Sequence, residues 1–170
     1  MTVGVVREAL IMRHGKSDWA TDEPDFTRPL AARGERDARR MAAWLVERGL
    51  EPDRVITSTA TRAHTTAQAV IDAFDIDDSR VEARDSLYLA NAWTWLEALE
   101  DGPQGRVLLC GHNPGLDDLV EYLSAEPTPR SHDGKLMTTA AIAHFAFDEE
   151  WSGVGRASGH LLSLVRPREL

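Results

Sequence analysis

Short apolar runs alternate along the chain with longer segments whose apolar residues recur at helical spacing. The runs predict strands over residues 8–13, 53–57, 81–83, 106–110, 140–147 and 160–165. The longer segments predict helices over residues 31–48, 58–74 and 91–100, and a further helix from Pro114. Strands that alternate with helices indicate a mostly parallel sheet with helices on both faces. We therefore expect an α/β, three-layer sandwich formed as a single domain over residues 1–170.

Charge and cysteine content narrow the classes of function. A net charge of -9 argues against nonspecific nucleic-acid binding, because no basic block offsets it. No apolar run reaches the length of about 18 residues that a membrane span needs. The first ten residues lack the parts of a signal peptide, and the single cysteine, Cys110, cannot form an internal disulfide. These features predict a cytoplasmic protein with a buried, reduced thiol.

Polar residues stand where two of the predicted strands end. Arg13 and His14 follow the first strand, and His112 follows the strand over residues 106–110. Arg62 falls in the first turn of the helix that follows the second strand. Because ligands of such sheets bind beyond the carboxyl ends of the strands, we expect these four side chains to converge at one edge.

Two arginines and two histidines at a sheet edge suit a phosphoryl group. Guanidinium groups are planar donors that match a tetrahedral phosphate, and helix N-termini after Thr59 and Asn113 would add amide donors. Ser58 or Thr59 would cap the second helix, and Asn113 the helix that begins at Pro114. A neutral imidazole can attack phosphorus to form a covalent phosphohistidine. The constellation therefore predicts phosphoryl transfer through a histidine.

Three motifs resemble those of the histidine phosphatase superfamily, whose fold is phosphoglycerate mutase-like. They are LIMRHGKS at residues 10–17, TSTATRAHTTA at 57–67 and LLCGHNPG at 108–115. The resemblance implies that His14 is the nucleophile, that Arg13 and Arg62 bind the phosphoryl oxygens and that His112 contacts the same group. Gly15, Ser17 and Asn113, which lie in the first and third motifs, are further candidates for phosphate contacts.

The resemblance is closest to the SixA-type phosphohistidine phosphatase branch and runs from Leu10 to about Asp148. The stretches DFTRPLAARG, GHNPGLDDLVEYL and LMTTAAIAHFAF are similar to that branch. No large insertion between strands is present to build a lid, whereas the sugar-phosphate mutases of the superfamily generally have one. Mutases carry an asparagine at the place of Ala20, and this departure sets the chain apart from them.

Four acids in the loop after the first motif are candidates for the general acid: Asp18, Asp22, Glu23 and Asp25. A poor leaving group needs an acid to protonate it. Asp25 lies three residues before Arg28, as the branch pattern has it, so we expect Asp25 to be the acid. A phosphohistidine would demand less from this acid than an ester would, because a protonated imidazole is a reasonable leaving group.

The expected protein is a metal-independent phosphatase that acts through a covalent phosphohistidine, with a phosphohistidine protein as its partner and no cofactor. No pair of His or Cys residues shows zinc spacing, so we expect no metal site. Two alternatives remain open at this point. One is a phosphatase of the same superfamily for a small sugar or nucleotide phosphate ester, and the other is a non-catalytic phosphate-binding module. The sequence does not indicate an oligomeric state.

Overall fold

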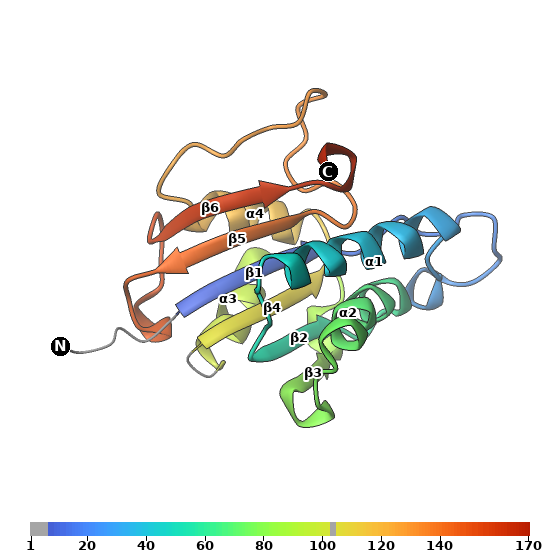
Figure 1. Ribbon diagram of the computed structural model, residues 1–170, viewed down its shortest axis with the longest axis horizontal. Coiled ribbons are helices and arrows are strands. Elements are labelled where there is room, and N and C mark those ends of the chain that lie inside the picture. The colour runs from blue at the N-terminus through green and yellow to red at the C-terminus, as the bar shows by residue number, and fades with distance from the viewer. Residues whose placement is uncertain (1–6, 103–104) are drawn as a thin grey trace.

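The computed structural model describes residues 7–102 and 105–170, which share one six-stranded sheet in the order β3-β2-β4-β1-β5-β6 (Figure 1). Its strands are β1 (Arg7–Arg13), β2 (Arg54–Ser58), β3 (Val81–Arg84), β4 (Gly105–Gly111), β5 (Ile142–Phe147) and β6 (Gly159–Val165). The first four are parallel to one another, and β5 pairs antiparallel with both β1 and β6. The sheet is therefore mixed and mostly parallel, as predicted.

Helices cover both faces of this sheet and complete the predicted three-layer sandwich. On one face lie α1 (Ala32–Glu47) and α2 (Thr61–Phe74), and on the other α3 (Ala92–Glu100) and α4 (Gly115–Leu123) (Figure 1). Single 3₁₀ turns occur at Asp25–Thr27, Asp78–Arg80, Asp85–Leu87, Trp151–Gly153 and Pro167–Glu169. Two of these turns, at residues 25–27 and 85–87, carry residues to the candidate site.

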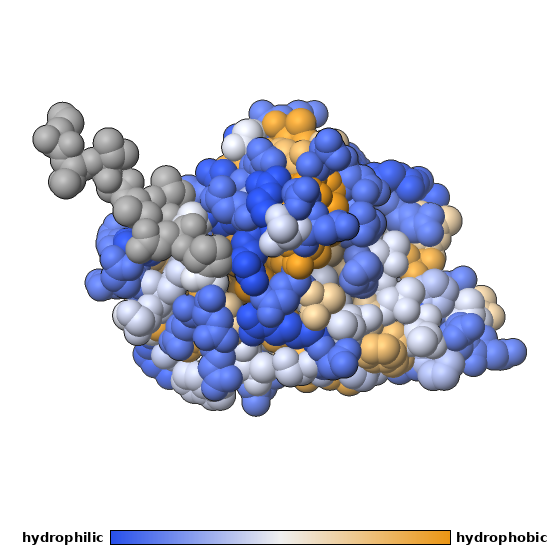
Figure 2. Space-filling model, turned by 90° about the horizontal axis from the view of Figure 1, so that it is seen from below, coloured by the Kyte–Doolittle hydropathy of each residue, from blue (hydrophilic) through white to orange (hydrophobic). Residues whose placement is uncertain are grey.

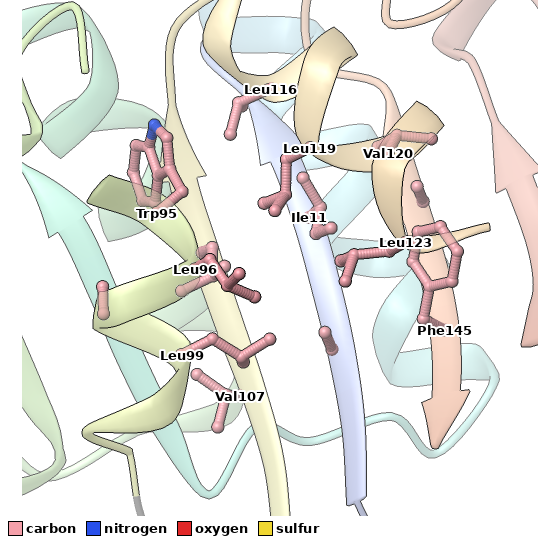
Figure 3. Close-up of a cluster of buried hydrophobic side chains, with 14 of the residues drawn as sticks. Ile11, Trp95, Leu96, Leu99, Val107, Leu116, Leu119, Val120, Leu123 and Phe145 are labelled. Atoms are coloured by element: carbon pink, nitrogen blue, oxygen red, sulfur yellow. The ribbon is translucent and has the colours of Figure 1, made fainter. Parts of the chain in front are cut away.

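The core has two halves because successive strand residues point to opposite faces. In β1, Leu10 and Met12 pack under α1 and α2, whereas Ala9 and Ile11 pack under α3 and α4. Figure 3 shows the half under α3 and α4, in which Trp95 and Leu99 of α3 and Leu119 and Leu123 of α4 lie over the central strands. With both faces filled, the middle of the sheet is rigidly held, and residues at its edge can be placed accurately.

The cap of α2 differs from the prediction because the predicted capping groups bond elsewhere. The N-cap of α2 is Ala60, with no side-chain cap, since the Ser58 hydroxyl faces His112 and the Thr59 hydroxyl donates to Asp85. The amides of the first turn of α2 are thus left without a side-chain acceptor.

The helix predicted to begin at Pro114 begins instead at Gly115, one residue later, but Asn113 Oδ1 accepts from the first-turn amide of Asp117 at 3.1 Å, as the predicted cap would. A Cβ atom at Gly115 would lie 2.0 Å from the backbone oxygen of Ala90, so only glycine allows the helix to start against that segment. The strand predicted over residues 140–147 also starts later than expected. Strand β5 begins at Ile142 because residues 138–141 form a turn, which is closed by a hydrogen bond of 3.0 Å from Ala141 N to Thr138 O.

The predicted absence of a signal peptide concerns the first ten residues, of which residues 1–6 lie outside the described part of the chain. Among the residues that are described, no helix has the length and apolar character needed to cross a bilayer. Figure 2 shows one face of the molecule, on which small groups of hydrophobic residues are separated by hydrophilic ones. Cys110 is buried as a free thiol, as predicted, while the cytoplasmic location stays a prediction.

Candidate active site

The carboxyl ends of β1, β2 and β4 lie at the same edge of the sheet, on the right in Figure 1. Arg13 is the last residue of β1 and His14 follows it, while His112 directly follows β4. Arg62 is the second residue of α2, which follows β2. The structure thus brings together the four residues that the sequence singled out, and the imidazole rings of His14 and His112 are 5.3 Å apart between centroids.

The His14 ring is held by the backbone next to it. Its Nδ1 lies 2.7 Å from the carbonyl oxygen of Gly15, and the residue is only 8% exposed. Because a carbonyl can only accept, Nδ1 carries the proton and donates it, which leaves the lone pair of a neutral ring on Nε2. This is the tautomer that a nucleophilic imidazole needs.

The loop that carries His14 is clamped against α1 and α2. Gly15 N donates to the Thr66 hydroxyl at 3.0 Å, and that hydroxyl donates to the carbonyl of Arg62 at 2.7 Å. On the other side, a Cβ at Gly34 would lie 2.1 Å from the carbonyl oxygen of Lys16, so the first turn of α1 packs directly on this loop. The nucleophile and Arg62 are therefore positioned by one shared hydroxyl.

Both arginines are fixed by hydrogen bonds. Arg13 donates through Nη1 to the carbonyl of Met137 at 2.9 Å, and burial together with nearby Arg62 lowers its pKa below the usual range. Arg62 is 3% exposed and donates to the backbone oxygen of Asp25 at 2.6 Å and to its Oδ2 at 3.1 Å. A guanidinium oriented in advance loses little side-chain entropy when an anion binds.

His112 is held by two residues that the sequence analysis missed. Its Nε2 lies 2.8 Å from the Ser58 hydroxyl, and its ring meets the edge of Tyr88 at 5.5 Å between centroids. The sequence predicts Ser58 only as a possible helix cap, although its place at the end of a strand beside the second motif is a usable signal for a site residue. Nothing in the sequence pattern pointed to Tyr88, which reaches the site from the turn after β3.

Asp25 alone among the four candidate acids contacts an active-site arginine. Besides Arg62, it binds Arg28 through an ion pair of 2.8 Å, and the Tyr88 hydroxyl donates to its Oδ2. These donors lower the pKa of Asp25 to about 2, the Tyr88 hydrogen bond being the largest contribution. The carboxyl is therefore ionised at neutral pH, and it must first gain a proton before it can act as the predicted acid.

The other three acids make contacts within their own loop or at the surface. Asp18 accepts from Ala20 N, Glu23 accepts from the Thr27 hydroxyl, and Asp22 is exposed. Their positions give no reason to prefer any of them to Asp25.

Ser17 and Asn113, predicted to contact phosphate, make bonds within the protein. Ser17 is buried and forms a β-bridge with Leu30. Asn113 donates through Nδ2 to the carbonyl of Met137 at 3.0 Å, and its Oδ1 accepts from Asp117 N at 3.1 Å. Because Met137 O also accepts from Arg13, Asn113 and the arginine share one anchor. A phosphate contact by Ser17 or Asn113 stays a prediction.

Burial keeps both active-site histidines neutral. Desolvation, opposed by the Gly15 hydrogen bond, lowers the pKa of His14 to about 3, and desolvation with nearby Arg62 lowers that of His112 to about 4. The exposed His160 has the opposite shift, because Asp148 and Glu126 raise its pKa above the usual value. At neutral pH the site therefore offers a lone pair on His14 rather than a cation.

These shifts predict a fixed order of protonation in a histidine NMR titration. As the pH falls, His160 should take up its proton first, then His112 and last His14. Between about pH 4 and the ordinary value of 6.5, His14 and His112 bind more protons in the unfolded chain than in the folded one. The free energy of unfolding should therefore decrease as the pH falls through that window. A His14 ring that is protonated at pH 6 in the free enzyme would contradict this prediction.

Within residues 7–102 and 105–170, no group of three or more His, Cys, Asp or Glu side chains is arranged to hold a metal ion. The positive charge at the site comes from arginines instead. Metal-independent catalysis stays a prediction.

Comparisons with known proteins point to one family. Residues 9–88 match the family model of the histidine phosphatase superfamily, branch 1. Phosphohistidine phosphatase SixA of Escherichia coli is 34% identical over 152 residues, which cover 86% of this chain and 89% of that protein. An uncharacterised Mycobacterium tuberculosis protein is 30% identical over 164 residues, covering 92% of this chain and all of that one.

Solved structures of related proteins have the same fold as this chain. The structure of the protein histidine phosphatase SixA complexed with tungstate superposes with a TM-score of 0.76 at 28% identity, covering 95% of this chain and 97% of that one. A mycobacterial glucosyl-3-phosphoglycerate phosphatase, at 15% identity and a TM-score of 0.63, covers 93% of this chain and all of that chain, and it shares the fold alone. With its fold and its extended identity to SixA, the chain belongs to the histidine phosphatase superfamily.

Proposed function

We propose that the protein is a phosphatase that forms a covalent phosphohistidine on His14 and that its substrate is a phosphohistidine of another protein. The observation that carries the proposal is the neutral His14 ring, whose Nδ1 is held by Gly15 O beside Arg13, Arg62 and His112. An imidazole fixed in this tautomer, next to two guanidinium groups, is suited to attack phosphorus.

In the first step, His14 Nε2 attacks phosphorus while the bond from phosphorus to the leaving group breaks. The phosphorylated ring keeps its proton on Nδ1 and becomes a cation, which the hydrogen bond to the Gly15 carbonyl stabilises. Arg13 and Arg62 bind the equatorial oxygens and balance their charge in the transition state, while the neutral His112 contacts the same group. In the second step, water attacks phosphorus, the bond to Nε2 breaks, and His14 returns to its neutral form as phosphate leaves.

The state of Asp25 favours a phosphoramidate over an ester as substrate. A phosphohistidine protonated on its free ring nitrogen leaves as neutral imidazole and needs no further proton, whereas an alkoxide leaving group does. The ion-paired Asp25 carboxylate has no proton to give at neutral pH. SixA, the 34% identical relative, is by its name a phosphohistidine phosphatase, which supports the same substrate class.

The test is a comparison of kcat/KM for a phosphohistidine protein and for small sugar and nucleotide phosphates. We expect the phosphohistidine protein to be the better substrate by at least about tenfold, since one positioned proton transfer contributes about 10²- to 10⁴-fold. Faster turnover of a small ester would favour the first alternative. No turnover of any substrate, an aryl phosphate included, would favour the non-catalytic module.

Replacement of Asp25 by asparagine distinguishes an acid from a carboxylate that positions Arg62. If the ionised form is the working one, Asp25→Asn should lower kcat/KM for aryl phosphates of good and poor leaving groups by similar factors, about tenfold each. Thr27→Val, which replaces a hydroxyl of the same 3₁₀ turn with a methyl group, is the matched control and should leave these rates near wild type. A much larger loss for poor leaving groups would restore Asp25 as the general acid.

A further inference from the structure

A second, positively charged pocket opens beside the nucleophile loop. It has a volume of about 510 Å³ and lies between the first turn of α1, the loop over residues 131–139 and the C-terminal 3₁₀ turn. Arg13 and Lys16, on either side of His14 and Gly15, form part of its wall. The pocket therefore borders the candidate active site and shares Arg13 with it, whereas Arg62 and His112 do not line it.

The charges in this pocket do not cancel. Six arginine or lysine residues and three carboxylates line it: Arg13, Lys16, Arg33, Lys135, Arg166 and Arg168, and Asp37, Asp133 and Glu169. Each carboxylate is paired with one cation, in the pairs Arg33–Asp37, Lys135–Asp133 and Arg166–Glu169. Lys16 and Arg168 are exposed and have no acidic partner within the part of the chain that is described. This surplus occurs in a chain whose net charge is -9.

The pocket wall is built around a buried arginine. Arg166 is 4% exposed and donates to the carbonyls of Leu136, Pro129 and Lys135 at 3.0, 2.6 and 3.2 Å. These bonds fix the loop after α4 against the C-terminal turn. The cations that line the pocket are therefore carried by segments that Arg166 holds together.

Exposed apolar side chains flank the other side of the site. Phe26 meets the edge of Tyr88 at 5.0 Å between centroids, and Trp19 stacks on the Arg28 guanidinium at 3.6 Å. Trp19 is 70% exposed and Phe26 38%. A small phosphate ester would leave these rings uncovered, whereas a protein surface that brings a phosphorylated side chain to His14 would cover rings and pocket together.

We propose that this pocket binds carboxylates of the phosphoprotein substrate that lie near its phosphohistidine. The inference rests on the proposed function and adds a substrate preference to it. An acidic partner would be repelled by the overall charge of this protein, so a local group of cations both attracts it and orients it toward His14.

The test uses two phosphohistidine peptides of equal length, one with Asp and Glu beside the phosphohistidine and one with Asn and Gln at the same places. In the wild type, kcat/KM should be about three- to tenfold higher for the acidic peptide, the range that two or three exposed ion pairs provide. The ratio should fall toward one at about 0.5 M salt, since exposed charges are screened.

The variant Lys135→Gln with Arg168→Gln should bring the ratio close to one at low salt. Arg39→Gln with Arg156→Gln removes the same charge from exposed positions outside the pocket and should keep the wild-type ratio. Equal rates for both peptides in the wild type, or an unchanged ratio in the pocket variant, would overturn the inference while leaving the proposed function intact. Hydrolysis of neither peptide, with turnover of an aryl phosphate, would overturn the proposed function itself.

Discussion

Replacement of His14 by alanine is expected to lower kcat/KM by about 10⁴-fold or more, because it removes the group that forms the covalent intermediate. The remaining arginines and His112 would still bind phosphate, so KM or the inhibition by orthophosphate should change far less than kcat. Because His14 is only 8% exposed, we do not expect water to replace the missing imidazole as nucleophile.

The intermediate itself provides the decisive measurement. Brief incubation of the wild type with ³²P-labelled substrate should yield a protein adduct that is labile in acid and stable in alkali, located on the peptide that contains residue 14. His14→Ala should yield none. The matched control is His64→Ala, which removes an exposed histidine of α2 and should keep both activity and adduct. An acid-stable adduct, or one that persists in His14→Ala, would show that another residue is the nucleophile.

The sequence predicted the layered fold because strand and helix periods alternate clearly and the apolar runs are short. It also predicted the meeting of Arg13, His14, Arg62 and His112, since parallel strands end at a common edge. What it could not show is how these groups are held. The Thr66 hydroxyl, which joins Gly15 to Arg62, lies one helical turn from that arginine and looks like an ordinary helix residue until the loop is placed on it.

The state of Asp25 lay beyond the sequence for a similar reason. Its loop carries four acids, and a pattern can favour one of them but cannot show which donors surround it. Tyr88 approaches from a segment more than sixty residues away, and its hydrogen bond is the largest cause of the lowered pKa. A pKa is a property of three-dimensional surroundings, so the sequence could name the carboxyl without indicating its charge.

Arg62→Lys is expected to lower kcat/KM by about 10²- to 10³-fold, the range found when one preorganised donor to a transition state is lost. Lysine keeps the charge but not the planar fork, so it cannot bind Asp25 through both the backbone oxygen and Oδ2 while also facing the phosphoryl group. Inhibition by orthophosphate should weaken by at least about tenfold.

Arg54→Lys provides the matched control for this prediction. Arg54 begins β2, at the opposite end of the strand from the site, and forms a partly buried ion pair of 2.6 Å with Glu82. The same substitution at residue 54 replaces the guanidinium of an ion pair that lies away from the phosphate-binding residues. We therefore expect kcat/KM to stay within about twofold of wild type. If Arg62→Lys matched Arg54→Lys in activity, a point charge would suffice at residue 62. The guanidinium held by Asp25 would then stabilise the folded protein rather than bind the phosphoryl group.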